Sequence, residues 1–88
     1  MSSDERAQIA RAMRELKPNA LQCYAQHKVA GIADLAIVLD GRGHVDQVTV
    51  RGDFAATPTG ECIQSVVREA RLPGLGRVIH FTWPYVLR

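Results

Sequence analysis

The chain has 88 residues, of which 47% are apolar and 23% are charged, and its formal net charge at pH 7 is +2. This length predicts one domain spanning residues 1–88, and the apolar content excludes an intrinsically disordered segment. Most of the excess positive charge is arginine scattered along the chain, so the charge pattern favours neither a nucleic-acid footprint nor a membrane-surface footprint. The start Met1-Ser2-Ser3 is compatible with a piece cut from a longer, membrane-anchored protein.

Residues 2–29 have helical periodicity. Ser2 followed three residues later by Glu5 predicts a capping box at the helix start. Pro18 interrupts the pattern and predicts a kink or a break near residues 15–17, and Pro18 would be tolerated in the first turn of a second helix. One apolar stripe runs along the segment, formed by Ile9, Met13, Leu16, Ala20, Cys23 and either Tyr24 or His27.

The segment Gly31–Gly52, GIADLAIVLDGRGHVDQVTVRG, predicts a β-hairpin that the rest of the chain covers or extends. Residues 40–43 include two glycines, which permit a tight reversal between the two apolar runs. In the second run, Val45 and Val48 reach the same face only if the strand bulges near Asp46-Gln47. The first run places four side chains on one face, those of Ala33, Leu35, Ile37 and Leu39.

A second helix and a last strand follow the hairpin. Thr57 as N-cap and Pro58 in the first turn predict a helix that runs to about Arg71. We expect this helix to bury Cys62, Val66 and Ala70, with Ile63 and Val67 flanking them. Residues 77–88 alternate as a strand, and Pro84 restricts that strand to a sheet edge. Its expected faces are Ile79, Phe81, Trp83 and Tyr85 on one side and Val78, His80 and Thr82 on the other.

The element order helix, strand, strand, helix, strand predicts an α+β fold. We expect a two-layer sandwich with a three-stranded antiparallel sheet in the order 2-1-3 and both helices on one face. In this arrangement the first strand is central, and the third strand is left at an edge.

The two cysteines allow several interpretations. A disulfide between Cys23 and Cys62 would close a loop of about 40 residues and suit an oxidising compartment such as the periplasm, whereas two buried thiols would act as small hydrophobes. A metal site would combine Cys23, His27 and Cys62 with His44 or His80, but the spacing of these residues matches no C-x-x-C pattern. A solvated His27 at the helix end is the simpler interpretation.

Catalysis is not expected, and neither a cofactor nor a metal is predicted. A Cys23–His27 or Cys62–His80 nucleophile pair lacks a group to orient the base. The glycine-containing segments at residues 41–43 and 73–76 match no phosphate loop. Four carboxylates near the hairpin are interpreted as solvent-face and turn residues, namely Asp34, Asp40, Asp46 and Asp53.

The last strand offers two possible binding surfaces. Its aromatic residues, with Arg77 and Arg88 nearby, could stack nucleic-acid bases, but packing beneath the helices is the favoured interpretation. Its exposed edge between Arg77 and Trp83 is a template on which an extended peptide can add as a strand, with Pro84 limiting the register at the far end.

Four segments in this order, LKPNALQCYAQ, GIADLAIVLDGRGHVDQVTVRG, TPTGECIQSVVREARLP and VIHFTWPYVL, resemble the TonB C-terminal domain family. They are most similar to the variant in myxobacterial envelope and gliding-motility proteins (the AgmX/PglI type). The matching features are Cys23-Tyr24, Gly43-His44-Val45, Cys62 and Trp83-Pro84-Tyr85. This chain departs from the variant at Ala25, where the variant often has Glu, and in a short connection before Gly31.

The resemblance implies a periplasmic domain at the end of an inner-membrane-anchored protein. Such a domain binds an extended segment of an outer-membrane or periplasmic partner by strand addition and passes on force from a proton-driven motor complex. Carried onto this chain, the resemblance implies a Cys23–Cys62 disulfide and a binding edge formed by Val78, Ile79, His80, Phe81, Thr82 and Trp83. Two alternatives stay open: a domain that dimerises through its edge strand, and a small nucleic-acid-binding module.

Overall fold

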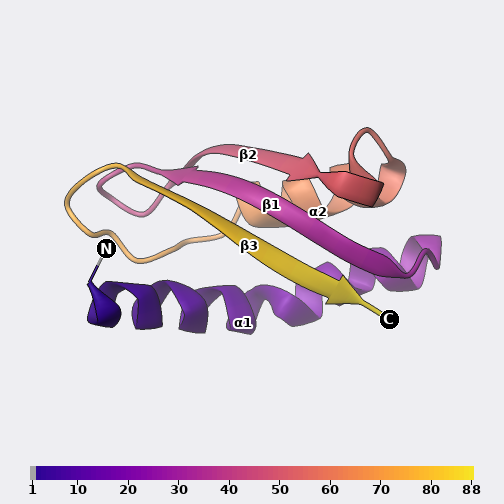
Figure 1. Cartoon of the computed structure of the whole chain (residues 1–88), viewed down its shortest axis with the longest axis horizontal. Helices are drawn as coiled ribbons and strands as arrows, with labels where there is room; N and C mark the ends of the chain where they lie inside the picture. The colour runs from indigo at the N-terminus through magenta and orange to yellow at the C-terminus, as the bar shows by residue number, and fades with distance from the viewer. Residues whose placement is uncertain (1) are drawn as a thin grey trace.

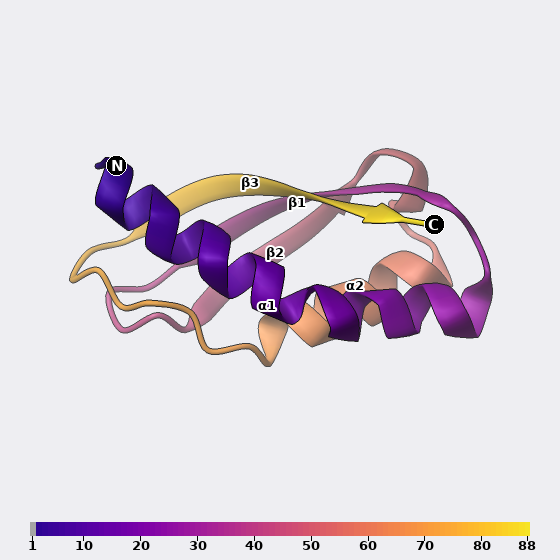
Figure 2. The same cartoon turned by 90° about the horizontal axis from the view of Figure 1, so that it is seen from below.

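The computed structural model describes residues 2–88 and arranges them in two layers (Figure 1). Strands β1 (Gly31–Leu39), β2 (Val45–Arg51) and β3 (Ile79–Leu87) form one antiparallel sheet in the order β2-β1-β3. Helices α1 (Ser3–His27) and α2 (Pro58–Arg68) lie on one face of this sheet (Figures 1 and 2), and a short 3₁₀ helix, η1 (Gly52–Phe54), follows β2. The predicted α+β class and strand order are confirmed.

The β1–β2 hairpin contains the bulge that the sequence predicts. Val38 pairs with Gln47 and Leu39 pairs with Val45, so Asp46 is the extra residue on β2. This offset brings the buried Val48 and the half-buried Val45 to the face that packs against the helices. The same face of β1 carries Ala33, Leu35, Ile37 and Leu39, each no more than 1% exposed.

Helix α1 is one helix of 25 residues with Pro18 in its interior, so the predicted break and second helix are wrong. Figure 2 shows that the helix changes direction part-way along its length and then continues. The capping box is confirmed, because the Glu5 amide donates to Ser2 Oγ at 3.2 Å and the Ser2 amide donates to Glu5 Oε1 at 3.0 Å. Lys28, with φ 58°, ends the helix and its amide donates to the Tyr24 carbonyl.

Helix α2 starts as predicted but is shorter and rotated. Thr57 caps it, accepting a hydrogen bond from the Gly60 amide at 3.0 Å, and Pro58 is its first residue. The helix ends at Arg68 rather than Arg71. The side chains it buries are those of Ile63 and Val67, whereas the expected core residues Cys62, Val66 and Ala70 are only half-buried.

The burial of α2 is explained by a disulfide between Cys23 and Cys62, whose Cα atoms lie 5.7 Å apart. The bridge confirms the pairing that the resemblance implied. Cys62 is therefore bonded to α1, and Ile63 and Val67 are the residues of α2 that join the buried core. With both sulfur atoms in this bond, the thiol, metal-ligand and nucleophile interpretations of the cysteines are wrong.

Candidate functional site

Strand β3 has one side without a partner strand. It pairs with β1 over its whole length of nine residues, from Ile79 opposite Leu39 to Leu87 opposite Gly31. In the part of the chain that the structure describes, no strand lies on its other side. The edge therefore begins one residue later than the predicted Val78 and continues past Trp83 to Leu87, because Pro84 stays within the ladder opposite Asp34.

Pro84 indicates which main-chain groups of β3 face the free side. Proline has no N–H, so it is tolerated in a ladder where its nitrogen points away from the neighbouring strand. Main-chain groups alternate between the two sides of an antiparallel strand. We therefore infer that His80, Thr82 and Val86 also direct their N–H and C=O groups outward, and that Pro84 contributes a carbonyl alone.

The structure agrees with the favoured packing of the β3 aromatic residues beneath the helices and not with the base-stacking alternative. Tyr85 is 2% exposed, and its hydroxyl donates to the Met13 carbonyl at 2.7 Å. Burial raises the pKa of Tyr85 above its ordinary value of 10.0. Phe81 and Trp83 are half-buried against the core, as expected from packing beneath the helices.

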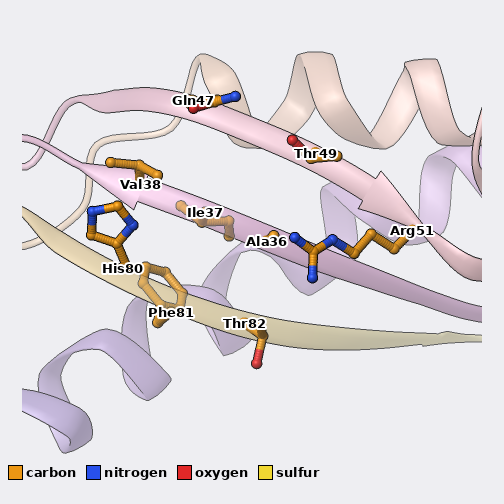
Figure 3. A pocket seen from close by; sticks show the side chains of 9 residues that line it. All are labelled: Ala36, Ile37, Val38, Gln47, Thr49, Arg51, His80, Phe81 and Thr82. Carbon is orange, nitrogen blue, oxygen red and sulfur yellow. The ribbon is translucent and has the colours of Figure 1, made fainter.

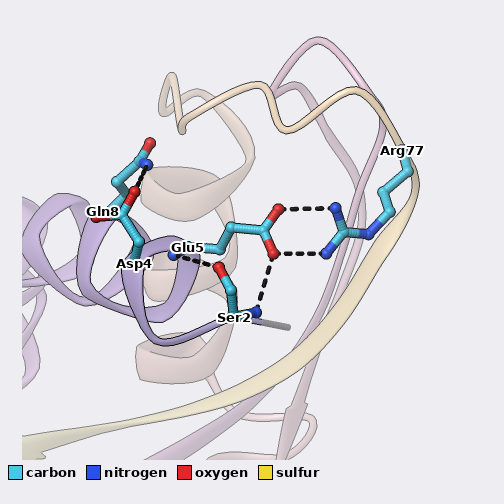
Figure 4. Close-up of polar contacts among 5 residues, drawn as sticks. All are labelled: Ser2, Asp4, Glu5, Gln8 and Arg77. Carbon is cyan, nitrogen blue, oxygen red and sulfur yellow. Dashed lines mark hydrogen bonds and ion pairs between the residues drawn. The ribbon is translucent and has the colours of Figure 1, made fainter.

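Arg77, the second element of that surface, is held by Glu5 (Figure 4). Two guanidinium N–H groups donate to the two carboxylate oxygens, each at 2.7 Å, across a separation of 72 residues. These bonds, with a further one from the Ser2 amide, lower the pKa of Glu5 from 4.5 to about 2. The pair fixes the approach to β3 against the start of α1.

Two hollows lie between α1 and the free side of β3. The first has a volume of about 250 Å³ and lies between Arg6, Ile9 and Ala10 of α1 and Phe81, Thr82 and Trp83 of β3. The second, of about 210 Å³, continues along the strand from Trp83 to Val86 and is bordered on the helix by Arg14 and Lys17. Sequence analysis missed these α1 residues, although the four-residue spacing of Arg6, Ala10 and Arg14 places them on one flank of the helix.

The opposite face of the sheet is not covered by the helices and carries a shallow hollow of about 410 Å³ (Figure 3). In Figure 3 the Arg51 side chain from β2 extends toward Ala36 of β1, whereas His80 from β3 lies at the other end of the hollow, near Val38. His80 is thus on the face away from the helices, whereas Cys62 lies on α2. His44, the alternative to His80 in the disfavoured metal interpretation, has its Nδ1 atom 3.3 Å from Asp40 Oδ2 in the hairpin loop, where main-chain N–H groups lower the pKa of Asp40.

Residues 2–88 contain no cluster of three or more His, Cys, Asp or Glu side chains that could hold a metal ion. Within the same range, no helix combines the length and apolar character needed to cross a membrane. The chain matches no family model, no curated protein and no solved structure. Its function is therefore inferred from the geometry around β3 and from the sequence motifs.

Proposed function

We propose that this chain is a non-enzymatic peptide-binding domain, which accepts an extended segment of a partner protein as a fourth strand on β3. The observation that carries this proposal is the unpaired side of a nine-residue edge strand. Unpaired N–H and C=O groups along such an edge bind an extended chain by main-chain hydrogen bonds. Partner sequence then matters less than extended conformation and a few side-chain contacts.

The two edges of the sheet differ in how they are protected, and the difference supports β3 as the binding edge. Proteins block unwanted strand addition with charged side chains, bulges or short edges. Strand β2 has such features, because Asp46 bulges and Arg51 ends the strand. Strand β3, IHFTWPYVL, contains no Lys, Arg, Asp or Glu and pairs with β1 without a register shift, and its one protective feature is Pro84, which lacks an N–H at one outward position.

The cellular setting of this proposal comes from the sequence motifs. We place the domain in the periplasm, at the C-terminal end of an inner-membrane-anchored protein, as the resemblance to TonB C-terminal domains implies. There it would couple an outer-membrane or periplasmic partner to an inner-membrane energy-transducing complex, of the kind used in gliding motility. The Cys23–Cys62 disulfide is compatible with an oxidising compartment.

The proposal is tested by adding a terminally blocked extended peptide to the isotope-labelled domain and recording amide NMR spectra. We expect shifts and slower hydrogen exchange at His80, Thr82 and Val86, which we infer to be the outward amides. Shifts confined to the helices, with β3 silent, would contradict the proposal. The variant Thr82→Pro removes one outward N–H and should abolish binding, whereas Thr82→Val keeps the N–H and should bind as the parent does.

The same edge can pair with a second copy of the chain, and sedimentation across a concentration range separates this alternative. A mass that rises with concentration in the parent, but not in Thr82→Pro, would replace the peptide partner by a second copy. A mass independent of concentration leaves the edge free for another protein.

A further inference from the structure

We infer that the segment bound at β3 contains an apolar residue flanked by two acidic residues, one two positions before it and one two positions after it. Ala10 of α1 contacts the apolar residue, and Arg6 and Arg14 contact the two acidic residues. This inference rests on the proposed strand addition and adds the chemical class of the partner.

The position of α1 brings these residues to the edge. Helix α1 passes beneath β3 at an angle, and both elements run from the same end of the molecule toward the other (Figures 1 and 2). The first turns of α1 lie at the β3 edge of the sheet, and its later turns lie beside α2 (Figure 2). A strand added beyond β3 would point alternate side chains toward α1, over the two hollows bordered by Arg6, Ala10 and Arg14. The other side chains would point to the opposite face of the sheet.

The spacing on the helix matches the spacing on a strand. Residues four apart on a helix are separated by about 6 Å along its axis. Residues two apart on a strand are separated by about 6.7 Å and share a face. Because Arg6, Ala10 and Arg14 border the two hollows, three successive helix-facing residues of the bound strand come opposite them in turn, although α1 crosses β3 at an angle. The small Ala10, between Ile9, Phe81 and Trp83, leaves an apolar hollow for the middle residue.

The charge on this flank of α1 favours acidic residues at the two outer positions. Arg6, Arg14 and Lys17 are exposed, and none of them forms an ion pair within residues 2–88. The residues that border the two hollows include no Asp or Glu. The three acidic side chains of α1 have other partners: Asp4 accepts a hydrogen bond from Gln8, Glu5 binds Arg77, and Glu15 pairs with Arg11 on the other flank.

Nucleic acid fits this surface less well than an acidic peptide. Base stacking needs exposed aromatic faces, but Tyr85 is buried and Trp83 is half-buried. Arg77, which could have contacted a phosphate, is held in two hydrogen bonds by Glu5. A polyphosphate also offers no apolar group for the hollow beside Ala10.

The test uses three blocked heptapeptides of alternating sequence, Thr-X-Thr-Val-Thr-X-Thr, in which X is Asp, Asn or Lys. At low salt we expect the Asp peptide to bind about fourfold more tightly than the Asn peptide, since each of its two exposed ion pairs contributes about twofold. The Lys peptide should bind most weakly, and added salt should reduce the differences. The double variant Arg6→Glu/Arg14→Glu should reverse the order and prefer the Lys peptide. The control Arg11→Glu/Arg68→Glu makes the same change of net charge on the other flank of α1 and on α2, and it should keep the parent order.

Each outcome decides between the two proposals. If all three peptides shift the β3 amides with equal affinity, strand addition stands and the acidic preference is wrong. If no peptide shifts those amides, strand addition itself is wrong and this inference falls with it. If Arg11→Glu/Arg68→Glu changes the peptide order as strongly as Arg6→Glu/Arg14→Glu does, the effect comes from net charge and the assigned contacts are wrong. Tighter binding of a thymidine oligonucleotide than of the Asp peptide would also overturn the inference.

Discussion

Reducing the Cys23–Cys62 disulfide should remove a large part of the domain's stability. The bridge joins residues 39 apart in the sequence. In the chain-entropy model, closing a loop of that size restricts the unfolded chain and is worth about 4 kcal/mol at 25 °C. A domain of this length has a free energy of unfolding of about 4–13 kcal/mol, so the reduced protein should be marginally stable.

Urea denaturation followed by Trp83 fluorescence, with and without reductant, measures this effect. The reduced chain should unfold at lower urea and with a larger m-value, because its unfolded state exposes more surface. The variant Cys23→Ala/Cys62→Ala should be at least as unstable as the reduced parent, since it also removes buried sulfur. A loss below about 1 kcal/mol, with an unchanged m-value, would show that the loop is already restricted in the unfolded chain and would refute the reasoning.

Three further predictions concern single contacts. Tyr85→Phe removes the hydroxyl that donates to the Met13 carbonyl, and it should lower the free energy of unfolding at pH 7 by about 1–2 kcal/mol, as measured by urea denaturation. Because the pKa of Tyr85 is raised in the folded state, the parent should also lose stability above about pH 10, and the variant should lose less. Gly43→Ala should lower the free energy of unfolding by about 2 kcal/mol or more, because Gly43 has φ +90° and a Cβ there would collide with the Leu72 carbonyl. Gly52→Ala should lower it by about 1 kcal/mol, because Gly52 has φ +79° but open space around it. Equal losses in the two variants would contradict this prediction. An NMR titration of the Glu5 carboxyl should give a midpoint near pH 2. The stability that the Glu5 carboxylate contributes is therefore present above pH 4.5 and lost as pH falls toward 2. In Arg77→Gln the midpoint should rise, and an unchanged midpoint would rule out the ion pair as the cause of the low pKa.

The sequence correctly predicted the features that depend on residues close together in the chain, namely a β-bulge and two helix caps. The odd spacing of Val45 and Val48 required a bulge, and the structure places Asp46 there. The Ser2–Glu5 capping box and the Thr57 cap depend on neighbours within three residues, and both form. These features need no knowledge of distant parts of the chain.

The incorrect predictions concern features that depend on contacts with segments far away in the sequence. Pro18 disfavours a helix locally, but the turns after it are retained because Ala20 and Cys23 are buried and Cys23 is bonded to α2. The buried side of α2 depends on where the sheet and α1 lie, so the periodicity alone did not distinguish Cys62 from Ile63.

The candidate site was predicted in outline only. The edge position of the last strand follows from Pro84 and from the order of elements, both readable in the sequence. The flank of α1 that borders it depends on the angle at which the helix crosses the sheet. The ion pair of Glu5 with Arg77 joins residues 72 apart, and no local pattern indicates it.

The covalent bridge between the two helices also sets how far the domain can be stretched. Tension applied to the chain ends travels through the sulfur–sulfur bond and bypasses the enclosed hairpin, whereas β3 lies outside the closed ring. The 39 residue steps inside that ring correspond to about 130–140 Å of extended chain. A single molecule held between two beads should therefore lengthen by that much less when oxidised, and β3 can separate from the sheet while β1 and β2 stay within the closed ring.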